Sequence, residues 1–302
     1  MSQIPSSKFQ VPSSDPQAPT PDPRPLTPDF AAALTAQLQT RLLGNPLHFF
    51  TTLDSTNTQA TDLARAGAPE GTVVIADAQS GGKGRLGRSW VSPAKVNLYL
   101  SVILRPAVPA SLAPQLNLLA AVAVADTVGQ ICRLTPTIKW PNDLLVGGKK
   151  VCGILAEMQT EAGALRSVIL GIGVNINAPL SAFPESLRDK ATSLLLARGQ
   201  GVDRIAFTAT LLTHLEKWYV LWLQEGFPAL QPAWEGYAAE LIGKRITVAA
   251  PEGTMTGTVV GLDTDGALLL QEGQGGRPRR LLAGDVTVVE GYAHGENHNP
   301  RY

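Results

Sequence analysis

The chain has 302 residues, of which 44% are hydrophobic and 17% charged, and its 25 Lys and Arg side chains balance 25 Asp and Glu side chains. A zero net charge provides no overall field for nucleic acid, so binding of that kind would require a local basic patch. Two cysteines, Cys132 and Cys152, form neither a disulfide framework nor a spacing typical of metal ligands. We expect both to be buried, reduced thiols in a cytoplasmic protein.

The N-terminal segment, residues 1–28, is predicted to be a disordered tail. It contains 8 of the 23 prolines among Ser, Gln and Asp, and such a composition buries too little apolar surface to fold. The start of the chain lacks the apolar segment of a signal peptide, and no uninterrupted apolar run reaches the roughly 18 residues that span a membrane. We therefore expect a protein that is neither exported nor embedded in a membrane.

The next part of the chain, residues 29–240, mixes helical and strand patterns. An apolar stripe of Phe30, Leu34 and Leu38 predicts a helix that ends by Gly44. Further along, the patterns predict a strand over 48–53 and a helix capped at its start over 54–67. Two strands follow over 72–76 and 97–104, and then an Ala- and Leu-rich core helix over 111–130.

Short turns then join a series of apolar runs. These turns are too short for helical crossovers, which predicts antiparallel strands over residues 137–140, 144–146, 150–158 and 164–175. A helix over 203–225 has an apolar stripe that would cover the resulting sheet. Residues 241–291 contain five short β runs separated by Gly and Asp turns, which predicts a small β-barrel. Residues 292–302 are expected to be a flexible tail.

The segment 79–90, Gln-Ser-Gly-Gly-Lys-Gly-Arg-Leu-Gly-Arg-Ser-Trp, concentrates three cations, Lys83, Arg85 and Arg88, on a loop with four glycines. Glycine lets backbone N–H groups approach a ligand closely, and guanidinium groups hold phosphate or carboxylate oxygens. The pattern predicts an anion-binding loop, with a solvated basic turn as the alternative.

Two known phosphate-binding motifs do not fit this loop. The Gly82-x-Gly84-x-x-Gly87 spacing matches the dinucleotide fingerprint, but no helix opens after it and no parallel crossover unit is evident. A Walker A loop requires Ser or Thr after the lysine, whereas Gly84 follows Lys83.

Three later motifs add cations, amides and glycines: Lys139-Trp140-Pro141-Asn142-Asp143, Lys149-Lys150-Val151-Cys152-Gly153 and Gly171-Ile172-Gly173-Val174-Asn175. The four histidines lie outside these motifs, and no nucleophile with a paired base is visible. A carboxylate that is already ionised can attack a nucleotide phosphate without a histidine base. Such a reaction requires charge neutralisation and in-line placement, which Lys and Arg provide.

Taken together, these motifs resemble those of bacterial biotin protein ligases. The resemblance runs from about Phe49 to Glu290 and rests on five segments in the same order, namely 54–57, 82–90, 139–143, 150–154 and 171–175. It implies an α+β fold: a class II synthetase-like catalytic domain over 29–240, with a mixed, mainly antiparallel sheet covered by helices, and an SH3-like C-terminal barrel over 241–291.

The resemblance also implies a two-step reaction. Biotin and MgATP would give biotinyl-5'-AMP, and a lysine of a biotin carboxyl carrier protein would then accept the biotinyl group, with no permanently bound metal. Lys150 and Arg85 would be the catalytic cations. The biotin site would comprise Ser55, Thr56, Asn57, Gln79, Gly82, Lys83, Arg85, Lys150 and Gly153. The nucleotide site would comprise Arg85, Arg88, Trp90, Lys139, Asn142 and Asn175.

Two features depart from the family pattern. The family's loop usually has Arg at the position of Lys83, and Lys cannot make a bidentate fork. Ligases that double as repressors carry an N-terminal helix-turn-helix domain, whereas one Pro-rich tail and one helix precede Phe49 here. We therefore expect no specific DNA binding, while a homodimer remains open.

Two other functions compete with this interpretation. A lipoate ligase or octanoyl transferase shares the catalytic fold, but those families are not expected to carry the 82–88 loop in this form. A non-enzymatic protein of a different class would use the loop and Trp90 to bind RNA or single-stranded DNA, with strong dependence on salt.

Overall fold

The computed structural model describes residues 28–250, 253–273, 276–282 and 284–288. The two predicted tails, 1–28 and 292–302, lie outside these residues, except for Pro28, which begins the first helix.

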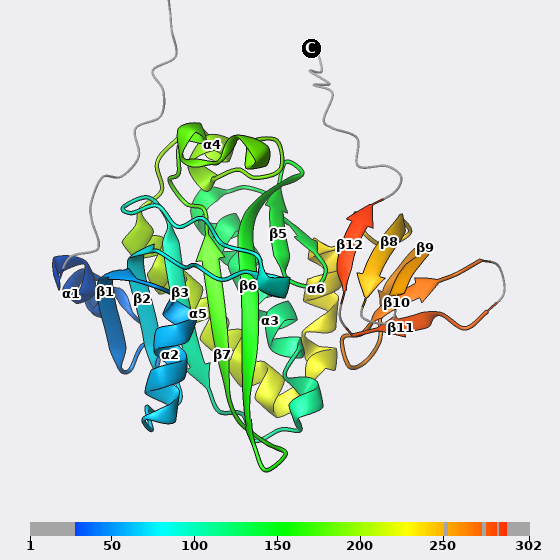
Figure 1. The fold of residues 1–302 in the computed structure, drawn as a ribbon, viewed down its shortest axis with the longest axis horizontal. Helices are drawn as coiled ribbons and strands as arrows, with labels where there is room; N and C mark the ends of the chain where they lie inside the picture. The colour runs from blue at the N-terminus through cyan, green and yellow to red at the C-terminus, as the bar shows by residue number, and fades with distance from the viewer. Residues whose placement is uncertain (1–27, 251–252, 274–275, 283, 289–302) are drawn as a thin grey trace, which may run out of the picture.

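The core of the protein is a seven-stranded sheet with the order β1-β2-β3-β7-β6-β5-β4 (Figure 1). Every neighbouring pair is antiparallel except β1 and β2, so the predicted mixed, mainly antiparallel sheet is confirmed. The strands are β1 (Leu47–Leu53), β2 (Val73–Gln79), β3 (Leu98–Leu104), β4 (Thr137–Lys139), β5 (Asp143–Val146), β6 (Lys149–Glu161) and β7 (Ala164–Val174).

The pairing of β1 with β2 corrects one sequence expectation. The helix α2 (Thr56–Arg65) connects these two parallel strands, so a parallel crossover unit is present although the sequence patterns did not reveal it. The glycine-rich loop follows β2 but opens only a three-residue turn, η1 (Arg85–Gly87), before the chain enters β3. The dinucleotide-binding interpretation therefore still fails, because no helix N-terminus follows the glycines.

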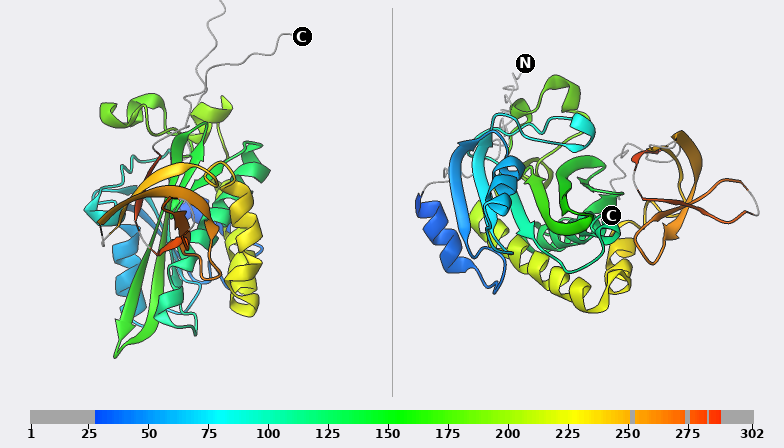
Figure 2. Two further views of the ribbon diagram at one scale, coloured as in Figure 1. Left: turned by 90° about the vertical axis from the view of Figure 1, so that its right-hand side faces the viewer. Right: turned by 60° about the horizontal axis from the view of Figure 1, so that its bottom comes forward.

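Helices cover both faces of the sheet, as the views in Figure 2 show. The face that packs on α3 (Gln115–Thr127) and α5 (Arg204–Glu225) forms the main core, and α1 (Pro28–Gln37) packs on α5 beside β1. The opposite face packs on α2 over a smaller cluster around Val74, Ile103 and Ile169. Two short helices, α4 (Leu194–Arg198) and α6 (Gln231–Tyr237), were not predicted.

The segment Ala110–Cys132, which contains α3, is long and apolar enough to cross a membrane by length and composition. However, 72% of its most apolar window is buried inside the protein. Burial between the sheet and α5 therefore accounts for its apolar character, as expected for a core helix.

The C-terminal part forms a second, antiparallel sheet with the order β11-β10-β9-β8-β12 (Figure 1). Its strands are β8 (Arg245–Ala250), β9 (Gly253–Leu262), β10 (Leu268–Gln271), β11 (Arg279–Leu281) and β12 (Asp285–Val288). All five predicted strands are present, but among the described residues β11 and β12 are the unpaired edges of an open sheet. Barrel closure thus remains a prediction.

Side-chain hydrogen bonds join this small sheet to the rest of the protein. Gln115 Nε2 donates to the carbonyl of Asp265 over 3.0 Å, and Trp222 Nε1 donates to Gln115 Oε1 over 2.6 Å. Gln231 Nε2 donates to the carbonyl of Leu262 over 3.1 Å. Because these amides lie at the start of α3 and α6, the two helices fix the small sheet against the larger part of the protein.

A single carboxylate on α5 anchors the turn that leads into β1. Glu216 accepts hydrogen bonds from the backbone N–H groups of Arg41, Leu42 and Leu43, each over 2.8 Å. Hydrogen bonds to a charged acceptor are stronger than neutral ones. Glu216 therefore connects α5 to the edge of the sheet.

Replacement of Glu216 by alanine should lower the free energy of unfolding by about 1–3 kcal/mol, because three backbone donors lose a charged acceptor. Urea denaturation of the wild type and Glu216→Ala measures this loss. The matched control is Glu225→Ala, an exposed glutamate on the same helix, for which we expect a change within about 0.5 kcal/mol. Equal stabilities of the two variants would contradict the anchoring role.

Candidate active site

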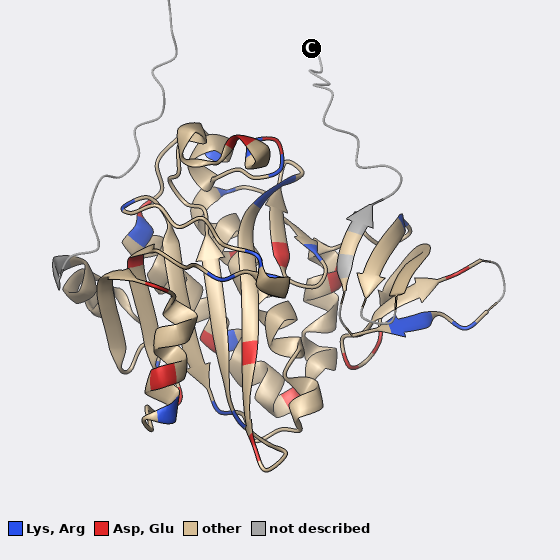
Figure 3. Ribbon diagram, viewed as in Figure 1, with Lys and Arg blue, Asp and Glu red and all other residues tan. Residues whose placement is uncertain are grey.

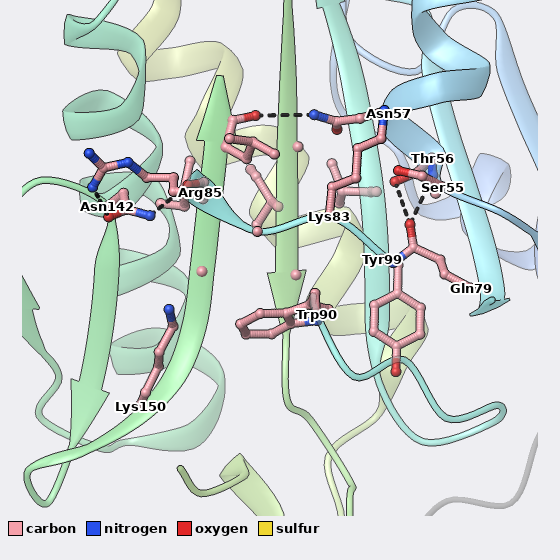
Figure 4. A pocket seen from close by; sticks show the side chains of 18 residues that line it. Ser55, Thr56, Asn57, Gln79, Lys83, Arg85, Trp90, Tyr99, Asn142 and Lys150 are labelled. Atoms are coloured by element: carbon pink, nitrogen blue, oxygen red, sulfur yellow. Dashed lines mark hydrogen bonds between the residues drawn. The ribbon is translucent and has the colours of Figure 1, made fainter. Parts of the chain in front are cut away.

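A pocket lies on the sheet face opposite α3 and α5, beside the start of α2 (Figure 4). Its walls come from β2, β3, β6, β7, the 80–92 loop and the β4–β5 turn. Ten of the residues predicted for the site line it: Ser55, Thr56, Asn57, Gln79, Lys83, Arg85, Trp90, Asn142, Lys150 and Gly153. Residues that are far apart in the sequence thus meet at one place.

The floor of the pocket is bare backbone. Gly153 on β6 and Gly173 on β7 are register partners, and the indole of Trp90 lies against both. A Cβ atom added at Gly153 would lie 2.8 Å from Trp90 Cζ3, and one at Gly173 would lie 2.7 Å from Trp90 Cε2. Because side chains alternate between the two faces of a strand, Ile172 and Val174 still pack into the main core. The Gly-Ile-Gly-Val pattern therefore creates a flat platform for an aromatic ring.

The glycine-rich loop folds back on itself as a narrow ladder. Trp90 N–H donates to the carbonyl of Gly82 over 2.8 Å, and Gly84 N–H donates to the carbonyl of Arg88 over 2.7 Å. A Cβ atom at Gly82 would lie 2.5 Å from the Trp90 carbonyl oxygen. The two sides of the loop therefore lie so close together that only glycine fits at this position. The ladder fixes the position of Trp90 relative to the cations at its tip.

A buried ion pair holds the far end of the same loop. Asp77 on β2 and Arg204 at the start of α5 are each 2% exposed, and Arg204 Nη2 lies 2.9 Å from Asp77 Oδ1. The same carboxylate oxygen accepts a hydrogen bond from the backbone N–H of Lys95 over 3.1 Å. The loop is thus attached to the sheet at both of its ends.

One end of the pocket is strongly basic. Lys150 Nζ lies 2.7 Å from Asp143 Oδ1 and 5.4 Å from the centroid of the Trp90 ring. Burial lowers the pKa of Lys139, Asp143 raises it, and the nearby Lys150 and Arg88 lower it further. Several cations therefore lie around a single carboxylate, which leaves an excess of positive charge for an anionic ligand.

Arg85 bridges the loop and the C-terminal sheet. Its Nη1 donates to Asn142 Oδ1 over 2.9 Å, and both terminal nitrogens lie 3.3 Å from the carbonyl oxygen of Gly284. Burial lowers the pKa of Arg85, and Asp143 partly offsets this effect. The guanidinium therefore lines the pocket where the β4–β5 turn approaches the residue before β12.

The other end of the pocket is lined by hydroxyl and amide side chains (Figure 4). Gln79 Oε1 accepts a hydrogen bond from the backbone N–H of Thr56 over 2.8 Å, and Gln79 Nε2 donates to Ser92 Oγ over 2.9 Å. The helix α2 begins directly after Ser55, whose hydroxyl does not cap it, so this hydroxyl is left beside the pocket. Such a set of hydroxyl and amide groups suits a neutral polar ligand group.

Four predicted residues do not line the pocket: Gly82, Arg88, Lys139 and Asn175. Gly82 supports Trp90, while Arg88 and Lys139 belong to the basic end described above. Asn175 is buried, and its amide donates to the carbonyl of Thr192 over 3.1 Å. The functional roles of these residues remain predictions.

The sequence analysis missed several wall residues, among them Tyr99, Leu100 and Leu155, and it named Gly171 and Gly173 only as part of a motif. The signal for the glycines was present in their two-residue spacing, which places both on one face of a strand. Tyr99 and Leu155 belong to ordinary strand patterns, which carry no sign of a ligand.

The described residues contain no group of three or more His, Cys, Asp or Glu side chains that would hold a metal ion. Both cysteines are free and buried, and burial raises the pKa of Cys132 to about 11 and that of Cys152 further. Neither thiol is therefore ionised at neutral pH. Basic and acidic residues are interspersed along the ribbon in Figure 3.

The chain is similar to several known proteins. Residues 49–175 match the Biotin/lipoate A/B protein ligase family, and residues 241–289 match the Biotin protein ligase C terminal domain. The bifunctional ligase/repressor BirA of Bacillus subtilis is 42% identical over 251 residues, which are 83% of this chain and 76% of that protein. The biotin–acetyl-CoA-carboxylase ligase of Paracoccus denitrificans is 37% identical over 74% of this chain and 93% of that protein.

A solved structure shows the same architecture. The biotin protein ligase from Aquifex aeolicus in complex with biotin and ATP is 28% identical, with a TM-score of 0.70, over 81% of this chain and 99% of that chain. The sequence and fold similarities thus cover both the large sheet and the small C-terminal sheet. The chain belongs to the biotin protein ligase family.

Proposed function

We propose that this protein is an ATP-dependent biotin protein ligase. It joins biotin to ATP, supplied as the magnesium complex, to form biotinyl-5'-AMP and pyrophosphate, and it then transfers the biotinyl group to a lysine of a biotin carboxyl carrier protein. The observation that carries the proposal is one pocket with an end of hydroxyl and amide groups, the indole of Trp90 on a glycine platform and a cluster of cations. This order matches a ligand with a polar ring, an apolar chain and a carboxylate.

The polar end accommodates the fused ring of biotin, with Ser55, Thr56, Asn57 and Gln79 around it. The carboxylate then reaches Lys150 and Arg85 across the platform, with Gly153, Gly82 and Lys83 beside the chain. For ATP, we assign Arg85, Arg88, Trp90, Lys139, Asn142 and Asn175. The supporting observations are the shared position of these cations and the half-buried guanidinium of Arg85.

The first chemical step requires charge stabilisation more than proton transfer. A carboxylate oxygen of biotin attacks the α-phosphorus of ATP, an oxygen–phosphorus bond forms, and the bond to pyrophosphate breaks. The carboxylate is already ionised at neutral pH, so no base is needed. Lys150, held by Asp143 at 2.7 Å, neutralises charge on the attacking carboxylate and on the phosphoryl oxygens.

In the second step the amine of the carrier lysine attacks the carbonyl carbon of the mixed anhydride. An amide bond forms, the bond between the carbonyl carbon and the AMP oxygen breaks, and the amine loses its proton. Arg85 stands at the mouth of the pocket, where it retains the adenylate until the carrier arrives.

The match of residues 241–289 to the Biotin protein ligase C terminal domain favours biotin over lipoate or octanoate, which are the substrates of the alternative functions. The test is pyrophosphate release with each acid in the presence of MgATP. We expect release with biotin and labelling of a purified carrier domain. Release with lipoate or octanoate alone would contradict the proposal.

The substitution Lys150→Ala should lower the rate of biotin-dependent pyrophosphate release by about 10²-fold or more, on the scale of one lost oxyanion donor. The matched control is Lys149→Ala, since Lys149 lies next to it on β6, bonds the Arg188 carbonyl and does not line the pocket. A rate like that of the wild type in Lys150→Ala would remove its catalytic role.

The substitution Arg85→Gly should weaken retention of the adenylate by about 10- to 100-fold, the worth of one charge-assisted contact. Activated biotin would then escape and label lysines of a bystander protein such as serum albumin, which a streptavidin blot measures. Arg133→Gly is the control, because Arg133 is exposed and already has a positive φ of 56°. Labelling restricted to the carrier domain in Arg85→Gly would count against this role.

A cytoplasmic location, a possible homodimer and the absence of specific DNA binding remain predictions.

A further inference from the structure

Glu157 lies on β6, two residues beyond the pocket residue Leu155, and is not itself one of the residues that line the pocket. Asn57 Nδ2 donates to Glu157 Oε2 over 2.6 Å and, more weakly, to the carbonyl of Leu155 over 3.4 Å. An ionised carboxylate accepts hydrogen bonds and does not donate them. The amide of Asn57 therefore has one favourable orientation, with its nitrogen toward Glu157 and its oxygen away from it.

The backbone next to Asn57 is shaped for this orientation. Gly171 is the register partner of both Ser101 and Leu155, so it lies between them in the sheet. A Cβ atom at Gly171 would lie 2.1 Å from Asn57 Oδ1. The missing side chain at Gly171 is thus what allows the amide oxygen of Asn57 to lie over the sheet, next to Ser101.

The orientation of Asn57 decides where the hydrogen of Ser101 points. Ser101 Oγ lies 2.6 Å from Asn57 Oδ1 and 2.8 Å from Thr56 Oγ1, and all three residues are buried. A serine hydroxyl carries one hydrogen, and an amide oxygen has none to give. The hydrogen of Ser101 therefore goes to Asn57, and Thr56 keeps its own hydroxyl hydrogen, which has Ser101 Oγ and Gln79 Oε1 as acceptors within reach.

This commitment leaves the Thr56 oxygen as an acceptor in the pocket. Thr56 Oγ1 lies 3.2 Å from Gln79 Oε1, which also accepts the backbone N–H of Thr56. The single hydroxyl hydrogen of Thr56 is used inside the protein, toward Gln79 or toward Ser101, and so does not point to the ligand. A ligand N–H can then donate to a lone pair of Thr56 Oγ1, whereas a ligand oxygen there would face lone pairs alone.

We propose that Glu157 is a positioning residue that sets the ligand selectivity of this pocket. By orienting Asn57, and through it Ser101 and Thr56, it makes the polar end an acceptor for a ligand N–H. The inference rests on the proposed function, since the ring of biotin is a cyclic urea with two N–H donors. The dithiolane of lipoate and the chain of octanoate have no N–H donor, so the same arrangement of acceptors disfavours their binding.

The test compares biotin with an analogue in which one ureido N–H is replaced by a ring oxygen, in competition with radiolabelled biotin by equilibrium dialysis. Each of the two ureido N–H groups is replaced in turn, and the analogue that binds the wild type more weakly is used for the comparison. In the wild type, the oxygen analogue should bind about 10²-fold more weakly than biotin, because a site built for a donor rejects the analogue that lacks it.

The variant Glu157→Gln keeps the shape of the side chain but lets both amides turn over, so that Thr56 can donate to the ligand. Biotin should bind about 3- to 10-fold more weakly, and the penalty for the oxygen analogue should shrink to about tenfold. Gly171→Ala, which displaces Asn57 directly, should shrink the same penalty. Glu161→Gln, on the same strand and paired with Arg166 at the surface, is the matched control and should retain the wild-type penalty.

Equal weakening of biotin and the analogue in Glu157→Gln and in Gly171→Ala would assign Glu157 a structural role and overturn the proposal. Urea denaturation of each variant shows whether it is folded. A wild type that binds biotin with no penalty for the analogue would overturn this inference and leave the proposed function intact. A wild type that binds no biotin would overturn both.

Discussion

The contact between the indole of Trp90 and the bare backbone of Gly153 and Gly173 is the constraint on which the pocket depends. The ring approaches the sheet so closely that a single Cβ atom at either glycine would overlap it. Trp90 is also paired through its backbone with Gly82, so the platform fixes the loop that carries Lys83, Arg85 and Arg88. Lys150 lies over the same ring. The buried pair of Asp77 and Arg204 holds the other end of the loop, because Asp77 also accepts the backbone N–H of Lys95.

The second feature is the balance of charge at the basic end. Burial and mutual repulsion lower the pKa of Lys139, burial lowers that of Arg85, and Asp143 opposes both effects. Cations gathered in this way repel one another until an anion binds. The free-energy cost of bringing them together is offset when the protein folds, so it does not add to the barrier of the reaction. Preorganised charge of this kind is what a reaction between a carboxylate and a triphosphate requires. The end with hydroxyl and amide groups has a different role. It recognises the ligand through the direction of its hydrogen bonds.

Much of the fold followed from local patterns. The apolar stripe from Phe30 to Leu38 and the short turns after Lys139 and Val146 predicted α1 and the antiparallel strands, because side-chain period and turn length reflect local geometry. The parallel pairing of β1 and β2 was not predicted, because it depends on how α2 packs across the sheet, which the local sequence does not show. The cations and glycines of the site could be predicted, because their concentration in short loops is unusual for this sequence. Glu157 could not be predicted, because it lies in an ordinary strand pattern and contacts the site only through Asn57, 100 residues away in the sequence.

The measurement that tests the central claim most directly is isothermal titration of biotin, lipoate and octanoate into the purified protein, with and without MgATP. The platform of Trp90 and the cations around Asp143 predict that biotin binds alone and that its binding becomes tighter when MgATP supplies the anion. Binding of lipoate or octanoate in preference to biotin would keep the fold and contradict the assigned substrate. Absence of binding by all three acids would contradict the account of the pocket itself.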